Sequence, residues 1–230
     1  MIKTYLEPTP WDRRNFPFET YQLTEYSEAA LRETDQVEGH FTVKVGSFED
    51  TKLLHEYGFY YADTLIAPFC KKERFLSERA EEVSFTEDFD KDEILNIAEE
   101  AFQGGRYHRD PNIPNNMADQ RYRNWVQDLI DQDLILAYKQ NGKIAGFFAY
   151  KDNQILLLAM HEDYRGKGMA TAFAGACVNE QFKRTGYSEL KTSISPSNPA
   201  SLNVFLGLGF RLGPATDIYH KLNGTLGERE

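Results

Sequence analysis

The feature that most constrains the fold is an uninterrupted apolar run followed at once by a glycine-rich loop. Residues 155–160, ILLLAM, contain no polar side chain, which predicts a strand buried on both faces of a sheet. The next stretch, HEDYRGKGMATAFAGA, begins with charged residues and glycines and continues with small residues. Larger side chains then recur at helical spacing, at Met169, Phe173, Cys177, Val178 and Phe182. We therefore predict a strand, a glycine loop and a helix that ends at Thr185-Gly186.

The glycine loop is suited to hold an anion. Arg165, Gly166, Lys167 and Gly168 precede the helix, whose first N–H groups and positive dipole end favour negative charge. A P-loop pattern is absent, and the Rossmann fingerprint lacks its third glycine because Thr171 stands there. A tight loop with a solvated basic pair is the alternative interpretation. The flanking strand and helix favour an anion-binding loop, and a pyrophosphate would fit the pattern.

The rest of the C-terminal portion predicts a mixed α/β fold. The expected helices cover residues 93–103 and 117–131, and a short helix capped by Ser197 or Asn198 runs to Leu206. The expected strands cover residues 134–138, 144–150, 189–194 and 210–221. Asn141-Gly142 separates the first two strands, and this pair is a strong hairpin signal. Those two strands should therefore be antiparallel neighbours.

The N-terminal portion repeats the pattern at the end of the chain. A strand at residues 41–45, a helix at 48–57, Gly58-Phe59 and a strand to residue 69 match the strand, helix, Gly209-Phe210 and strand order. Coincidence is the alternative, since glycine commonly ends a helix. We predict a smaller, degenerate N-terminal α/β half in residues 1–80, a larger domain in residues 81–230, and a connector at residues 71–82.

Composition excludes several classes of protein. The 230 residues suit one or two domains, and a net charge of −10 argues against a nucleic-acid partner. The start lacks the apolar core of a signal peptide, and no apolar run approaches the roughly 18 residues of a membrane span. We therefore expect a soluble, cytoplasmic protein with no membrane partner. Cys70 and Cys177 show no redox or zinc spacing, so we expect buried thiols.

Two motifs carry a resemblance to a known family. Arg165-Gly-Lys-Gly-Met-Ala170 resembles the glycine signature of the GNAT superfamily of acyl-CoA-dependent N-acyltransferases, and NPASLNVFLGLGF resembles its later helix and turn. The resemblance spans residues 83–222. It implies a mixed, mostly antiparallel central sheet flanked by helices, with acetyl-CoA as cosubstrate. The cofactor-binding residues that it implies are Ala159, Met160, Arg165, Gly166, Lys167, Gly168, Met169, Ala170, Asn198 and Phe205.

A narrower likeness covers more of the chain. Pro10-Trp-Asp12, Phe16, Gly105-Arg-Tyr-His-Arg-Asp-Pro111, Tyr122 and Trp125 resemble the bacterial dTDP-fucosamine acetyltransferase group. That group joins a truncated GNAT-like domain to a complete one and acetylates the amino group of nucleotide-linked deoxy-sugars. The likeness implies the same order here, and an amino-sugar nucleotide as acceptor.

Acetyl transfer needs a neutral amine near the thioester, a donor for the developing oxyanion, and preferably an acid for the thiolate. A backbone N–H near Met160 is the expected oxyanion donor. The acid of the family is a tyrosine, but Phe205 occupies its position. His108 is the candidate for an alternative proton carrier, and the other interpretation is an exposed loop histidine hydrogen-bonded to Asp110. Tyr107 and Asp110 could bind a sugar hydroxyl or amine, or cap the following helix.

Three function classes follow from these residues. The first is an N-acetyltransferase for the amine of a small molecule, acting as a monomer or homodimer. The second is an acetyltransferase for a protein N-terminus or a polyamine, which the acidic charge would attract. The third is a non-catalytic acyl-CoA-binding module, which Phe205 would suit. The remaining histidines, His40, His55 and His220, show no metal-ligand spacing, so we expect no metal.

Overall fold

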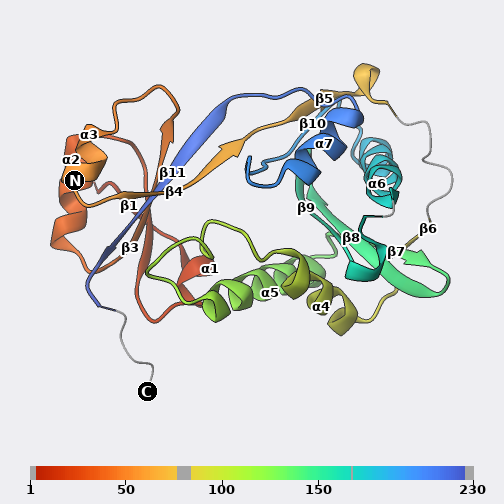
Figure 1. Cartoon of the computed structure of the whole chain (residues 1–230), viewed down its shortest axis with the longest axis horizontal. Helices are drawn as coiled ribbons and strands as arrows, with labels where there is room; N and C mark the ends of the chain where they lie inside the picture. The colour runs from red at the N-terminus through yellow and green to blue at the C-terminus, as the bar shows by residue number, and fades with distance from the viewer. Residues whose placement is uncertain (1–3, 77–83, 167, 226–230) are drawn as a thin grey trace. The chain divides into compact units, whose positions relative to one another are not determined.

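The computed structural model describes residues 4–76, 84–166 and 168–225. It contains two compact units, each built from separate stretches of chain (Figure 1). Unit 1 comprises Met1–Leu65, Gly104–Arg121 and Ala215–Glu230, and unit 2 comprises Ile66–Gln103 and Tyr122–Pro214. Helix α5, Asn115–Asp131, begins in the stretch assigned to unit 1 and continues in unit 2.

Unit 2 is built on a six-stranded sheet in the order β5-β10-β9-β8-β7-β6. Its strands are β5 Phe69–Lys71, β6 Ser84–Thr86, β7 Ile135–Gln140, β8 Lys143–Lys151, β9 Gln154–Met160 and β10 Glu189–Lys191. The β9–β10 pair is parallel and the other pairs are antiparallel. The predicted mixed α/β fold with a mostly antiparallel sheet is therefore confirmed. Asn141 and Gly142 both have positive φ, 51° and 79°, as the predicted β7–β8 hairpin requires.

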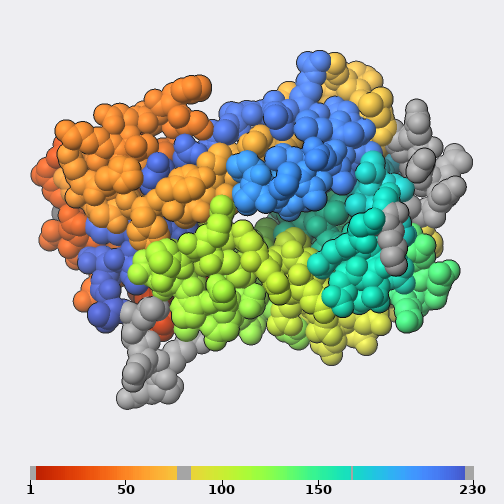
Figure 2. Space-filling model, in the orientation of Figure 1, coloured from red at the N-terminus to blue at the C-terminus, as the bar shows by residue number. Residues whose placement is uncertain are grey.

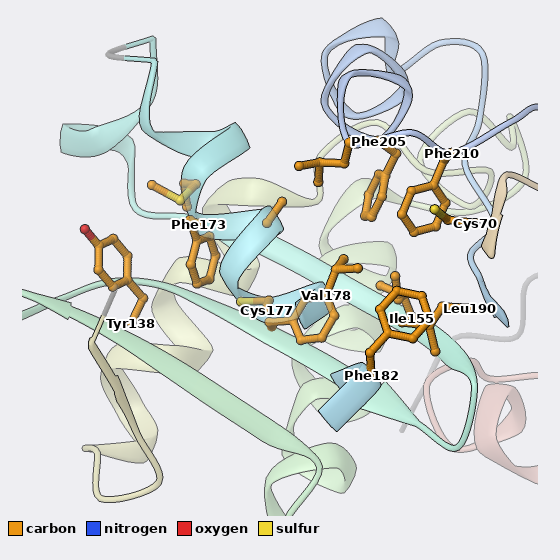
Figure 3. Packing of buried hydrophobic residues seen from close by; sticks show 14 of the residues in the cluster. Cys70, Tyr138, Ile155, Phe173, Cys177, Val178, Phe182, Leu190, Phe205 and Phe210 are labelled. Atoms are coloured by element: carbon orange, nitrogen blue, oxygen red, sulfur yellow. The ribbon is translucent and has the colours of Figure 1, made fainter. Parts of the chain in front are cut away.

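Helices cover both faces of this sheet because its central strands are apolar on both sides. One core packs the sheet against α6, Met169–Thr185, and α7, Pro199–Gly207 (Figure 3). Phe173, Cys177, Val178 and Phe182 lie in this core, so the predicted apolar stripe of α6 is confirmed. The other core packs the sheet against α4, Lys91–Ala101, and the second half of α5.

Unit 1 contains a five-stranded sheet in the order β1-β2-β3-β11-β4. Its strands are β1 Leu6–Pro8, β2 Thr20–Leu23, β3 Gly39–Gly46, β4 Tyr60–Ile66 and β11 Ala215–Asn223, and its short helices are α1 Pro10–Arg13, α2 Glu28–Glu33 and α3 Lys52–Glu56. Side chains alternate along β3. Phe41 and Val43 join the core beneath α2 and α3, whereas His40 contacts Phe18 in a separate aromatic cluster.

The division into units differs from the expected boundary at residue 80. The final strand, β11, pairs with β3 in unit 1, and β5, expected in the N-terminal half, pairs with β10 in unit 2. Both pairings join distant parts of the chain, which local sequence patterns do not report. The last strand also begins at Ala215 rather than at residue 210, because Gly213-Pro214 interrupts the segment. Part of the predicted connector, residues 77–82, lies outside the described residues.

The predicted internal repeat has a local structural counterpart. The helices α3 and α7 are each followed by a glycine with positive φ, 77° at Gly58 and 90° at Gly209. In both places the next residue, a buried phenylalanine, donates its N–H to a carbonyl five residues earlier. This is the bonding of a Schellman helix end. A truncated first domain in residues 1–80 stays a prediction.

Among the described residues, the longest helices fall short of the length and apolar content that crossing a bilayer demands.

Candidate functional site

The loop between β9 and α6 contains two glycines in the left-handed backbone region. The φ angle is 72° at Gly166 and 73° at Gly168, values that residues with a Cβ rarely adopt. Among the described residues, no atom lies within 4 Å of the Cβ that either position would carry. The path of the backbone therefore requires both glycines, and the described residues leave the space beside them open. Both are exposed, and the start of α6 lies at the surface shown in Figure 2.

Gly168 is also the N-cap of α6 and provides no side-chain hydrogen bond to the helix. The first N–H groups of this 17-residue helix, at Met169 and Ala170, therefore depend on solvent or a ligand. Together with the helix dipole, they form a site suited to a phosphate group. Lys167, which was expected to add charge here, lies outside the described residues.

Arg165 joins the loop to the end of β9. Its Nε donates a hydrogen bond of 2.8 Å to the carbonyl oxygen of Met160. The residue is nevertheless exposed, so its guanidinium keeps a positive charge beside the two glycines.

Within the part of the chain that the structure describes, β10 leaves one edge of β9 largely unpaired. The two parallel strands are paired at a single position, Lys191 opposite Gln154, while β9 continues to Met160. His161 donates its N–H to the carbonyl of Ala145 in β8, and Ala159 is paired with Phe147. Because backbone direction alternates along a strand, the N–H and C=O of Met160 point away from β8.

The same alternation separates the two residues expected to meet the pantetheine arm. Ala159 directs its backbone groups toward β8, whereas Met160 directs its own toward the unpaired edge. Leu158 has the same direction as Met160 and was not predicted, although the period of two along a strand could have identified it. We therefore place the available backbone groups at Leu158 and at the N–H of Met160, because the Met160 carbonyl already accepts from Arg165.

Two expected cofactor residues lie in or beside α7. Asn198 caps the helix, and its Oδ1 accepts a hydrogen bond of 3.0 Å from the N–H of Ser201. Phe205 is 3% exposed and packs at 70° against Phe210, with ring centroids 5.0 Å apart (Figure 3). The geometry thus gives Asn198 a capping role and Phe205 a packing role.

Tyr107 lies inside unit 1. Its hydroxyl donates to Asp12 Oδ2 at 3.0 Å, and the guanidinium carbon of Arg121 lies 4.5 Å from the centre of its ring. Phe16 packs against the same ring at 5.4 Å. Residues that carry the narrower family likeness thus meet in one interior cluster. The geometry favours a structural role for Tyr107 over contact with a substrate.

Asp110 is 2% exposed and accepts four hydrogen bonds. Its Oδ1 accepts from the Tyr60 hydroxyl at 2.8 Å and from the Asn112 N–H at 2.9 Å. Its Oδ2 is 2.9 Å from His40 Nε2 and 2.7 Å from His220 Nδ1. The carboxylate is therefore fully used by its own unit, which favours a structural role here as well.

Electrostatics keep Asp110 anionic. Burial alone would raise the pKa of Asp110, but hydrogen bonds from His220 and His40 outweigh burial and hold it far below its usual range. Burial lowers the pKa of His220 to about 3, although its hydrogen bond to Asp110 opposes the shift. Near neutral pH, Asp110 is thus ionised and His220 is neutral.

His108 differs from the exposed histidine that the alternative interpretation expected. Its side chain is 6% exposed, and Nε2 lies 2.9 Å from Asp119 Oδ1 rather than beside Asp110. Asp119 is in the first turns of α5, so a helix fixes the partner of this imidazole.

Sequence reasoning did not predict the approach of His40 and His220. They lie in β3 and β11, and 180 positions separate them in the chain. No local spacing reports a pair of this kind. The contact depends on β11 joining the sheet of unit 1.

A comparison with family models gives one match. The model described as the acetyltransferase (GNAT) family matches residues 91–210, just over half of the chain. No curated protein matches the chain.

Solved structures share the fold at low sequence identity. A GCN5-related N-acetyltransferase from Sphaerobacter thermophilus aligns with a TM-score of 0.57 and 16% identity, over 81% of this chain and 60% of that one. The chain thus spans less than two thirds of that protein. A functionally unknown conserved protein from Staphylococcus epidermidis aligns with a TM-score of 0.66 and 13% identity, over 97% and 93%. A GCN5-related glucosamine N-acetyltransferase region of a fungal multi-domain enzyme aligns with 0.58 and 10%, over 88% and 30%.

Proposed function

We propose that this chain, which belongs to the GNAT family of acetyltransferases, transfers an acetyl group from acetyl-CoA to the primary amine of a small molecule. The observation that carries the proposal is the junction of an unpaired strand edge with a glycine loop at a helix N-terminus. Such a junction offers backbone hydrogen bonds to an extended amide chain and a cradle to its phosphate end.

The backbone of residues 166–170 would hold the pyrophosphate, with Arg165 adding charge beside it. The backbone groups of Leu158 and Met160 would pair with the pantetheine arm and present an N–H to the acetyl oxygen. Acetyl-CoA supplies the activated thioester. The amine nitrogen bonds to the carbonyl carbon, the carbon–sulfur bond breaks, and the thiolate receives the proton that the amine loses.

In this proposal, most of the rate acceleration comes from positioning the amine beside the thioester. Phe205 provides no proton, and its ring lies in the core. A coenzyme A thiolate, with a pKa near the value of about 8.5 for cysteine, is a tolerable leaving group without an acid. Holding the amine and thioester together can contribute about 7–11 kcal/mol.

We further propose an amino sugar linked to a nucleotide as the acceptor. The narrower family likeness supports this class, as does the fold shared with a region named for glucosamine acetylation. The test is thiol release from acetyl-CoA with nucleotide-linked amino sugars, spermidine and a peptide with a free N-terminus. We expect release with the amino sugars. Release with another amine alone would overturn this acceptor class.

Binding of coenzyme A must be measured alongside turnover. Titration calorimetry with coenzyme A should show one site on the chain. Binding without turnover on every amine would identify a non-catalytic acyl-CoA-binding protein, and absence of binding would overturn the assignment of the glycine loop.

We propose His108 as the carrier of the proton that the amine loses. Its hydrogen bond to Asp119 holds the imidazole in one orientation, as a general base requires. His108→Gln should lower kcat/KM by roughly 10²–10⁴, while coenzyme A affinity stays unchanged. His55→Gln, at an exposed position of α3, is the matched control. An unchanged kcat/KM in His108→Gln would show that solvent accepts the proton.

A further inference from the structure

Two histidines and one aspartate meet in the interior of unit 1, outside the glycine loop. His40, Asp110 and His220 come from β3, the segment before α5, and β11. The three side chains are at most 2% exposed, and their ligand atoms all lie within 4.8 Å of one another. Three metal-ligating side chains rarely converge in an interior by chance, because buried polar groups are costly.

The three donor atoms have the chemistry that zinc prefers. Both imidazole nitrogens point at the same oxygen, Asp110 Oδ2, at 2.7 and 2.9 Å. A tetrahedral Zn²⁺ at about 2.1 Å from each ligand needs its ligand atoms about 3.4 Å apart. The two nitrogen–oxygen distances would need to lengthen by about 0.5–0.7 Å. The two nitrogens already lie no more than 4.8 Å apart, so small side-chain movements would make the three atoms ligands of one ion.

The other carboxylate oxygen already has the support that metal ligands receive. The Tyr60 hydroxyl and the Asn112 N–H both donate to Asp110 Oδ1, which fixes the plane of the carboxylate. Outer hydrogen bonds of this kind orient a ligating carboxylate and increase metal affinity.

Hydrogen bonds alone leave this cluster incomplete. His220 Nε2 is buried and has no hydrogen-bond partner among the described residues. The ring packs among aromatic side chains, at 5.3 Å from Tyr107 and 6.4 Å from Tyr60. Coordination through Nδ1 would move the proton to Nε2, and an N–H suits the negative faces of aromatic rings better than a lone pair does.

Charge also favours an ion. Asp110 places a carboxylate in the interior, and a divalent cation would be attracted to it. The burial of the three ligands leaves no exposed face for a substrate, so an ion here would be structural, with a water molecule as the fourth ligand that tetrahedral zinc needs.

We propose that His40, Asp110 and His220 form a structural zinc site that fastens residues 104–114 to β3 and β11. The proposal of this zinc site does not depend on the proposal of acetyl transfer.

The test uses the full chain, freed of metal with a chelator and titrated with Co²⁺ and then Zn²⁺. We expect d–d absorption that Zn²⁺ abolishes at one equivalent, one zinc per chain by mass spectrometry, and a Tm that rises with zinc concentration. His220→Gln should weaken zinc binding at least 10-fold. His55→Gln, an exposed histidine of the same unit, should bind as the native chain does.

Three results would overturn the proposal. They are less than one zinc bound to the folded native chain, binding that persists in His220→Gln, and binding lost in His55→Gln. If His220→Gln does not fold, NMR of the native chain decides: the His40 and His220 ring signals must shift with zinc, and their constancy would refute the site.

Discussion

At the scale of single residues, the sequence predicts the conformation of the glycine loop but not the direction of the aromatic side chain in α7. The glycines are specified by backbone angles that few other residues adopt, so the sequence alone indicated them. Phe205 occupies the family's tyrosine position, but the sequence could not show that its ring faces Phe210. The direction of a side chain can be predicted when one face of its helix is apolar and the other polar. Because α7 is apolar over much of its surface, its sequence does not show which face is buried.

Gly168→Val should weaken coenzyme A binding at least 10-fold, because the added side chain enters the open space where the phosphate would lie and strains the left-handed backbone. Calorimetry measures the affinity. Gly186 offers a matched control, since it ends the same helix with φ of 72° and equally open surroundings.

Gly186→Val should therefore cost a similar stability, about 1–2 kcal/mol, and leave the affinity unchanged. Equal losses of affinity in both variants would mean that strain, and not position, weakens binding. Unchanged affinity in Gly168→Val would refute the phosphate cradle.

At the scale of elements, periodicity predicted most of unit 2. The hairpin, the buried strand and the stripe of α6 were all visible as local patterns. Strand β10 was harder to predict from the sequence, because it contains three residues and pairs with β9 at a single position. The unpaired edge of β9 was therefore not predictable from spacing, although it decides which backbone groups face a ligand.

The thiols of β5 and α6 should make stability depend on pH in the alkaline range. Burial raises the pKa of Cys70 to about 11 and raises that of Cys177 well above its usual range. At pH 7 both thiols are protonated in the folded and in the unfolded chain. As pH rises above 9 the unfolded chain ionises first, so the free energy of unfolding falls.

The midpoint of urea unfolding, measured at pH 8, 9 and 10, tests this dependence. In Cys177→Ala the midpoint should fall less between these pH values. The comparison stops at pH 10 because tyrosines ionise above that value. An equally steep decline in Cys177→Ala would assign the effect to other groups.

At the scale of the whole molecule, pairings between distant segments are what local patterns could not supply. The expected boundary at residue 80 separates β5 from β10 and β3 from β11, although each pair shares a sheet. The cluster of His40, Asp110 and His220 depends on the same long-range pairing. Propensity and spacing describe neighbours in sequence, and these contacts join segments more than 100 residues apart.

Residues 1–80 and 81–230 expressed as separate chains should therefore fail to fold, since each loses strands of both sheets. Circular dichroism melts of each fragment test the expectation, with the full chain as control. Mixing the two fragments should restore a cooperative transition. A cooperative melt of residues 81–230 alone would show that the larger part is self-sufficient.

The position of β11 also sets an order of events during synthesis. β3 and β4 leave the ribosome well before β11, the strand that lies between them in the sheet, because every strand of the other sheet is translated between β4 and β11. Until β11 is made, both strands present open backbone edges of the kind that pair with foreign chains. The nascent chain must therefore keep these edges unpaired until Pro214, the end of unit 2, has been translated, and we expect chaperones to shield them during that interval.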